Sequence, residues 1–452
     1  MNADIYNDAP LFKAAEEYVK RAPARFHTPG HNGCARSPCG FMGEGLDYDL
    51  TELPETDSLY TADGPILRAE ELAARAFGTR LTLMSAGGAT LCIQAMLRLV
   101  RPRGKKIVMA RNSHISAVNA SALLGFEPEW VWPRRFEGSS LPGEICAEDV
   151  ARALEKTDGA SAVYITSPDY YGVMSDVAAI AEVCEKYGAP LLVDNAHGAH
   201  LFCLDGGAMH PARLGAAMTC DSAHKTLPVL TGGAWLEIMR GASREQAKDA
   251  MALFGSTSPS YPVMLSLDLV RVWMTRCGVE AFGSLRSKVE EIDALCAKLG
   301  FFRAGARFDP VRITVDTGSA GLSGFEAARL LGKAGVSSEM ADDRHVVLLP
   351  SPFNSAEDFR RLIGGLRGLP LRGTPLPIPA PPERPEAVIT PREALTAACE
   401  TVPATQSAGR ISAACRCPCP PGVPIVVPGE RITENLAHAL KNYGVDTVKV
   451  VK

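Results

Sequence analysis

A lysine that directly follows a histidine is the most chemically suggestive feature of this chain. Lys225 follows His224 and lies between a run of small residues and the glycine turn 231–233. A lysine amine held in an enclosed site can form a Schiff base with an aldehyde. A lone lysine is more often an ordinary solvated residue, so the interpretation depends on a second feature.

An aspartate upstream supplies that second feature. Asp194 closes the apolar run 190–193, which predicts a buried strand. A carboxylate at the carboxyl end of such a strand lies where open α/β sheets bind ligands, although Asp194 alone could also cap a helix. Pyridoxal phosphate requires an amine that reacts with its aldehyde and a carboxylate that pairs with its pyridine nitrogen. We therefore predict pyridoxal phosphate as the cofactor.

A glycine-rich turn could bind the phosphate of this cofactor. Gly87-Gly88-Ala89-Thr90 connects a predicted strand, 81–84, to a predicted apolar helix, 91–100. Free backbone amides and the helix dipole favour an anion at such a place, and glycine lets the backbone approach closely. The motif alone is weak because many strand-to-helix turns contain glycine. Its position before the aspartate and the lysine strengthens it.

The motifs also resemble a known family. Asp194-x-Ala-His-Gly-x-His200 and Ser222-x-His-Lys225 resemble the fold-type-I pyridoxal-phosphate decarboxylases of ornithine, lysine and arginine, most closely the short bacterial branch without an N-terminal wing domain. The C-terminal motifs are the most specific to this family. The resemblance covers nearly the whole chain, including the segments 26–31, 51–54, 111–114, 420–424 and 428–430.

This resemblance implies roles for the central residues. Lys225 would hold the cofactor, Asp194 would pair with its pyridine nitrogen, and His114 would stack on its ring. His197 would contact the ring oxygen or the substrate carboxylate, and His224 or Lys225 would return a proton to the α-carbon. Without the resemblance, His114 would be interpreted as a capping or core histidine.

It also implies how the phosphate and the substrate are held. The phosphate would be bound by Gly88, Ala89, Thr90 and Ser222, and by Thr257 and Ser258 from a neighbouring subunit. The loop 255–261 could instead be an ordinary capping loop. Glu430 would bind the basic end of the substrate, with a surface glutamate that caps a predicted helix at 431–440 as the alternative.

Four residues depart from the family pattern, among them Ala89, which lacks a hydroxyl that the family often has at this position. Asn195 stands where the family has a glutamate, Asn32 where it has a lysine, and Cys419 where it has an aromatic residue. Neither the change at Asn195 nor that at Cys419 removes the central machinery, but both could alter the choice of substrate.

The predicted activity is that of a carboxy-lyase: pyridoxal-phosphate-dependent α-decarboxylation of arginine, lysine or ornithine to a polyamine-type amine and CO₂. Another fold-type-I enzyme, such as an aminotransferase or lyase, would share Asp194, Lys225 and the phosphate turn. A non-catalytic regulator with the same fold is the third possibility. The C-terminal motifs argue against the former, and retention of Lys225 argues against the latter.

Alternating strands and helices predict an α/β fold, a mostly parallel sheet covered by helices, with the fold-type-I architecture. The expected divisions are an N-terminal arm at 1–60, a large cofactor-binding domain at 61–283, a small α+β domain at 284–369, a Pro-rich linker at 370–385 and a C-terminal module at 386–452.

Composition excludes several classes of protein. The 452 residues are 46% hydrophobic and 22% charged with a net charge of −4, which offers no electrostatic case for nucleic acid or an anionic membrane. No apolar run is long enough for a membrane span, and the N-terminus lacks a signal peptide pattern. We expect a cytoplasmic protein with reduced thiols, and a homodimer with shared active sites by resemblance.

The spacing of Cys415, Cys417 and Cys419 differs from the usual structural zinc pattern. We interpret this segment as extended chain, with metal binding as a minor alternative.

Overall fold

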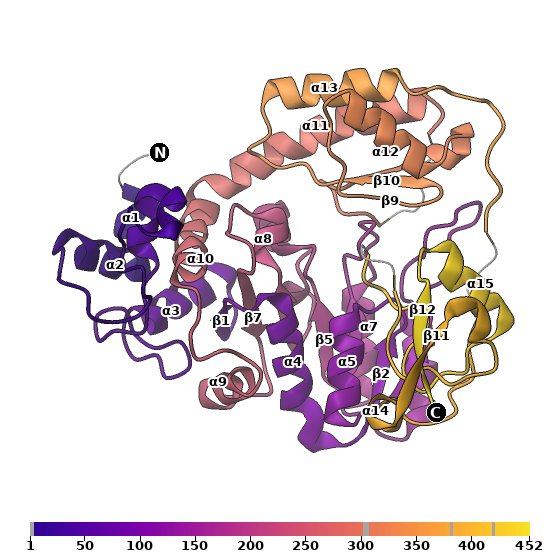
Figure 1. Ribbon diagram of the computed structural model, residues 1–452, viewed down its shortest axis with the longest axis horizontal. Helices are drawn as coiled ribbons and strands as arrows, with labels where there is room; N and C mark the ends of the chain where they lie inside the picture. Colours follow the sequence, from indigo (N-terminus) through magenta and orange to yellow (C-terminus); the bar gives the residue numbers. More distant parts are fainter. Residues whose placement is uncertain (1–3, 302–306, 380–382, 418–420) are drawn as a thin grey trace. The chain divides into compact units, whose positions relative to one another are not determined.

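The computed structural model describes residues 4–301, 307–379, 383–417 and 421–452 (Figure 1). The chain divides into two compact units. Unit 1 comprises Met1–Pro102 and Pro190–Glu280, and unit 2 comprises Arg103–Ala189 and Ala281–Lys452.

Unit 1 contains four neighbouring strands in the order β1-β7-β6-β5. β5 and β6 are parallel, whereas β7 runs antiparallel to both β6 and β1. Nearly every residue of these strands is buried, which explains their short, continuous apolar runs. The strands are β1 (Leu81–Ser85), β5 (Leu191–Asp194), β6 (Met218–Asp221) and β7 (Ala234–Ile238).

Helix α4 (Gly88–Val100) contacts β1, β6, β7 and α9, so its apolar residues pack onto these strands (Figure 1). The arm at the N-terminus carries α1, α2 and η1. The other helices of unit 1 are α1 (Asp4–Asn7), α2 (Pro10–Lys20), η1 (Pro38–Tyr48), α3 (Pro65–Phe77), η3 (Ala199–Cys203), η4 (Asp205–Gly207), η5 (Pro211–Arg213), α8 (Ala223–Thr226), α9 (Arg244–Ala252), α10 (Tyr261–Trp273) and the π-helical η6 (Met274–Gly278).

Unit 2 begins with three parallel strands in the order β4-β2-β3. Helices follow these strands in the chain, as the alternating pattern predicts. After η2 (Arg101–Arg103), which spans the boundary between the units, the elements are β2 (Lys106–Ala110), α5 (Ile115–Leu124), β3 (Glu127–Val131), α6 (Ala147–Thr157), β4 (Val163–Thr166) and α7 (Val177–Lys186).

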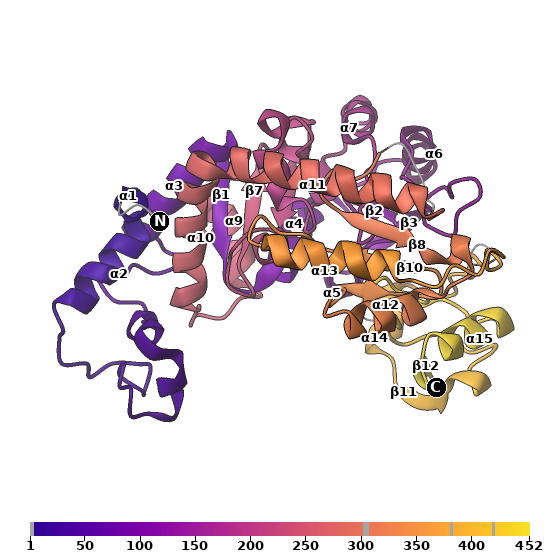
Figure 2. The same ribbon diagram turned by 90° about the horizontal axis from the view of Figure 1, so that it is seen from above.

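A small antiparallel sheet in the order β8-β10-β9 follows in unit 2. Helix α12 packs on β10 and against α13, and Figure 2 shows both helices beside this sheet. The elements are α11 (Val279–Lys298), β8 (Ile313–Asp316), η7 (Thr317–Ala320), α12 (Gly324–Lys333), β9 (Met340–Ala341), β10 (His345–Leu348) and α13 (Ala356–Arg367).

The C-terminal module pairs β11 with β12 and packs α15 over a small core of its own that includes Val426, Leu436, Leu440 and Val448. Its elements are α14 (Pro391–Thr396), β11 (Cys399–Pro403), η8 (Ala404–Gln406), α15 (Glu434–Asn442) and β12 (Thr447–Val451). The α/β fold class with a small α+β part and a C-terminal module is therefore confirmed, while the domain boundaries stay a prediction.

Two local expectations in the module have different outcomes. The predicted helix at 431–440 is wrong at its start: Thr433 caps α15, which begins at Glu434, because residue 431 bridges to Ile411 as extended chain. Cys415 is buried in an extended segment, and Arg416 bridges to Val426. Cys419 lies outside the described residues.

Among the described helices, none combines the length and apolarity that a membrane crossing needs. The cysteines of the described ranges are free thiols.

Candidate active site

The lysine of the predicted site lies on a one-turn helix directly after a buried strand. Lys225 belongs to α8, which follows β6, and its amide donates to the Ser222 carbonyl at 3.0 Å. The amide of His224 donates to the Gly233 carbonyl at 3.2 Å, which closes the glycine turn onto the helix. The backbone that carries the lysine is thus held at both sides.

The side chain of Lys225 contacts a histidine in the loop after the neighbouring parallel strand, β5. Its Nζ lies 3.0 Å from Nε2 of His197, which is 5% exposed and follows β5. A protonated lysine can only donate, so the histidine Nε2 accepts when the amine is charged. The amine of Lys225 thus contacts the loop that begins directly after Asp194.

Asp194 is a buried carboxylate at the carboxyl end of β5, where a ligand of this fold class binds. Its Oδ1 accepts the Ala196 amide at 3.1 Å and faces the Cys220 thiol at 3.6 Å. Burial first, and Asp194 second, raise the pKa of Cys220 well above its ordinary value. Cys220 is therefore a neutral thiol that donates to Asp194, a role that the sequence did not reveal.

The glycine turn forms the start of α4, as predicted. Gly88 is the first helical residue, with φ of +69°, and no side chain caps the first turn. A Cβ added at Gly88 would meet nothing within 4 Å, so the turn is open on that side. The Gly88 amide donates to the Gly232 carbonyl at 2.8 Å, which joins this turn to the lysine turn. The adjoining first-turn amides of Ala89 and Thr90 suit an anion.

These residues fit pyridoxal phosphate. Lys225 offers an amine, Asp194 a buried carboxylate, the first turn of α4 an anion site, and Ser222 a further buried hydroxyl. Thr257 and Ser258 are exposed in the loop after α9, and their predicted role toward a neighbouring subunit stays a prediction.

His224 is only half-buried beside Lys225. Burial first, and the Lys225 charge second, lower the pKa of His224. The imidazole is therefore largely neutral near pH 7, and a neutral imidazole is a weak proton donor.

His114 lies in unit 2 and caps α5. Its Nδ1 accepts the Ser116 amide at 3.2 Å, which is the alternative role considered from the sequence. Gly422 packs against its ring: a Cβ on Gly422 would lie 2.8 Å from the imidazole, and the Ile115 amide donates to the Gly422 carbonyl. Stacking of His114 on a cofactor remains a prediction.

Glu430, also in unit 2, is buried in an ion pair with Arg111. Its Oε2 accepts from Arg111 Nη2 at 3.1 Å and from the Val427 amide at 2.8 Å. Burial raises the pKa of Glu430, although Arg111 acts in the opposite direction. The alternative interpretation as a surface, helix-capping glutamate is therefore wrong, because Glu430 is not exposed and α15 begins later. Its substrate role stays a prediction.

Arg111 is a residue whose role the sequence did not reveal. It also donates to the carbonyls of Pro424 and Ile425 at 2.6 and 3.1 Å and lies over the rings of Trp130 and Trp132. Through these hydrogen bonds and the pair with Glu430, Arg111 holds the segment 424–430 of the module against the end of β2.

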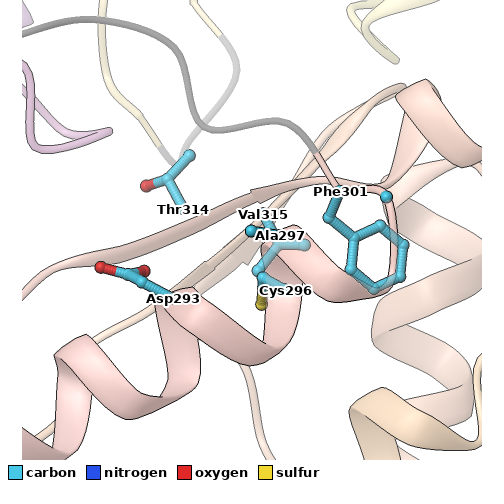
Figure 3. Close-up of a pocket in the computed structure, with 7 residues that line it drawn as sticks. Asp293, Cys296, Ala297, Phe301, Thr314 and Val315 are labelled. Carbon is cyan, nitrogen blue, oxygen red and sulfur yellow. The ribbon is translucent and has the colours of Figure 1, made fainter.

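A hollow of about 440 Å³ in unit 2 has no chemical candidate from the sequence in its lining. Figure 3 shows Asp293, Cys296 and Ala297 on α11 beside Thr314 and Val315 on β8. None of the residues predicted to bind cofactor or substrate lines it.

Comparison with known proteins identifies the family. The Orn/Lys/Arg decarboxylase major domain matches residues 9–288, and the C-terminal domain of the same family matches residues 380–443. The arginine decarboxylase of Bacillus subtilis is 29% identical, over 96% of this chain and 94% of that protein. The constitutive lysine decarboxylase of Escherichia coli is 24% identical, over 94% of this chain and 75% of that protein.

A solved structure supports the fold. The lysine decarboxylase of Francisella novicida superimposes with a TM-score of 0.83 at 18% identity, covering 98% of this chain and 81% of that chain. Together with the matched domains, this places the chain in the Orn/Lys/Arg decarboxylase family, whose members are pyridoxal-phosphate-dependent decarboxylases of basic amino acids.

Proposed function

We propose that this enzyme decarboxylates arginine, with pyridoxal phosphate bound through Lys225. The observation that carries the cofactor assignment is the geometry of unit 1, in which Lys225 contacts His197 beside the buried Asp194. The choice of arginine is supported by the Bacillus arginine decarboxylase, which this chain matches over nearly its full length. The lysine decarboxylase of E. coli is less similar and considerably longer.

Pyridoxal phosphate, when bound, supplies an acceptor for the electron pair that CO₂ leaves behind. Asp194 would hold a proton on the pyridine nitrogen, and its buried position strengthens this interaction. The first turn of α4 and Ser222 would bind the phosphate. These contacts orient the substrate so that the bond to its carboxylate can break.

The return of a proton to the α-carbon falls to Lys225 in this proposal. The lowered pKa of His224 leaves its imidazole mostly neutral, whereas Lys225 Nζ can carry a proton that His197 helps to direct. His224 would then line the site next to the Lys225 amine without donating the proton to the α-carbon.

The proposal further places the enzyme in the cytoplasm as a homodimer in which Thr257 and Ser258 reach the phosphate of the other subunit. Their exposure in this chain leaves them accessible to a second copy.

The test is CO₂ release by purified protein loaded with pyridoxal phosphate, using arginine, lysine and ornithine labelled in the carboxyl carbon. We expect arginine to be the fastest substrate, and Lys225→Arg to reduce release to background while keeping the charge. Faster release from lysine or ornithine would contradict the substrate assignment. Undiminished CO₂ release by Lys225→Arg would contradict the assignment of Lys225 as the residue that binds the cofactor.

A further inference from the structure

Four polar side chains form a buried cluster among β5, β6 and β7 that the mechanism does not use. Asn195, His210, Asp221 and Glu237, here called the carboxyl cluster, are each 0% exposed. Asn195 Nδ2 lies 2.6 Å from Asp221 Oδ1, and His210 Nε2 lies 3.0 Å from Asp221 Oδ2. One ligand atom each of His210, Asp221 and Glu237 lies within 4.8 Å of the others.

The histidine defines where one proton lies. His210 Nδ1 accepts the Ala212 amide at 3.2 Å, so it carries no proton, and the ring proton is on Nε2. Nε2 lies 2.8 Å from Asn195 Nδ2 and 3.0 Å from Asp221 Oδ2, and of these two atoms only the oxygen can accept. Asp221 thus receives two donors, from His210 and Asn195.

Glu237 receives no donor at all within the described residues. Neither of its carboxylate oxygens has a hydrogen-bond partner, although the side chain is fully buried. An isolated buried carboxylate is very costly, and two neighbouring carboxylates avoid this cost when one takes up a proton. Because Asp221 already has two donors, the proton belongs on Glu237.

A divalent cation is the other way to stabilise the two carboxyls, and the histidine argues against it. Ligation through Nε2 would require the ring proton on Nδ1, where it would face the Ala212 amide hydrogen. The cluster is therefore arranged for a shared proton.

We infer that Glu237 is a neutral carboxylic acid that donates to the ionised Asp221, and that this pair positions the two loops of the active site. Asn195 directly follows Asp194, and Asp221 directly precedes Ser222 on the way to Lys225. The backbone N–H of Asn195 also donates to the Cys220 carbonyl at 3.0 Å. The positioning role rests on the proposed function, whereas the protonation of Glu237 does not.

The inference accounts for the departure at residue 195. A glutamate there, as the family resemblance leads one to expect, would bring a third carboxyl toward Asp221 and Glu237. In this chain the side-chain amide of Asn195 instead donates to the carboxylate of Asp221, the last residue of β6. We expect Asn195→Asp to lower Tm, and the isosteric exchange Asn195→Asp with Asp221→Asn to recover part of the loss, because the exchange restores one carboxylate and one amide.

If Glu237 is protonated in the folded state, its contribution to stability depends on pH. The titratable groups around Glu237 are Asp221 and Cys220 on β6, Cys92 on α4, and His210. Burial first, and Asp221 second, raise the pKa of Glu237 well above its ordinary value. The folded state then binds more protons than the unfolded state above pH ~4.3, so Glu237 lowers stability as pH rises.

The experiment compares two buried glutamates of unit 1 by the Tm of the purified protein without substrate, from pH 5.5 to 8.5. Glu237→Gln keeps the shape and still donates to Asp221, so we expect Tm at or above wild type, with the gain largest at pH 8.5. Glu70, by contrast, is ion-paired to Lys248 and Arg244 and accepts the Met84 amide. Glu70→Gln should lower Tm at every pH.

Three results would overturn the inference. The first is a decrease in Tm in Glu237→Gln as large as the decrease in Glu70→Gln. The second is a rise in wild-type Tm on adding Zn²⁺ or Mn²⁺ that EDTA reverses and Glu237→Gln lacks. The third is the absence, in the infrared spectrum of wild type, of a protonated carboxyl band that Glu237→Gln removes. A protein that shows the expected pattern but releases no CO₂ would contradict the proposed function alone.

Discussion

At the scale of single residues, Asp194 is the most informative carboxylate. It is buried and accepts from Ala196 and Cys220, so an asparagine would fit the space but could not stabilise a positive pyridine nitrogen. We expect Asp194→Asn to lower kcat by about 10²–10³-fold with the cofactor still bound. Cofactor absorbance and CO₂ release measure the two effects. Asp205→Asn, an exposed carboxylate nearby in sequence, is the control and should leave both unchanged.

His224 gives a second residue-scale prediction, for stability against pH. Burial first, and Lys225 second, lower its pKa, so the unfolded state binds more protons than the folded state just below pH ~6.5. Wild type should therefore lose stability as pH falls through that window, and His224→Gln should lose less. Urea unfolding at pH 5.5 and 7.5 measures the difference. An equal loss in both proteins would contradict the prediction.

The sequence predicted Lys225, Asp194 and the Gly88 turn because each combines a telling residue type with a place just after a strand. It did not predict the carboxyl cluster, since His210 and Glu237 join Asp221 only through packing between strands. Asn32 shows the same limit: it has φ of 51°, a left-handed conformation that asparagine adopts more readily than lysine. That requirement is invisible in the sequence.

At the scale of elements, the segment 424–430 of the C-terminal module is held to β2 by Arg111 and Glu430. The strand at 81–84, the helix at 91–100 and the strand at 190–193 were predicted within a few residues, because each is a largely apolar run. The burial of Glu430 was not, since a glutamate before a predicted helix has no local sign of an arginine more than 300 residues away. Only the tertiary fold creates that pair.

Removal of this pair should therefore affect stability. We expect Glu430→Gln to lower the free energy of unfolding by about 3–5 kcal/mol, because the buried Arg111 charge loses its partner. Glu386→Gln is the matched control: its pair with Arg431 is exposed, and its loss should cost at most about 1 kcal/mol. Urea unfolding measures both. A raised KM for arginine in Glu430→Gln with unchanged stability would instead assign Glu430 to the substrate.

At the scale of the whole molecule, the N-terminal arm exposes large apolar side chains. Phe26 is 98% exposed and Phe41 is 87% exposed, which makes each a candidate for burial in a contact surface. If the arm forms the proposed homodimer, Phe26→Ser with Phe41→Ser should shift sedimentation toward the monomer. Phe353→Ser, at an exposed phenylalanine of unit 2, should leave the dimer intact. A double variant that sediments as wild type would remove the arm from the interface.

The central claim is that Lys225 holds the cofactor, and it can be tested by borohydride reduction of the protein loaded with pyridoxal phosphate, followed by mass spectrometry of its peptides. Reduction fixes the cofactor covalently to the amine that binds it. We predict the added mass on the peptide that contains Lys225, and its absence from Lys225→Arg. Added mass on another lysine, such as the buried Lys248, would contradict the assignment of the active site.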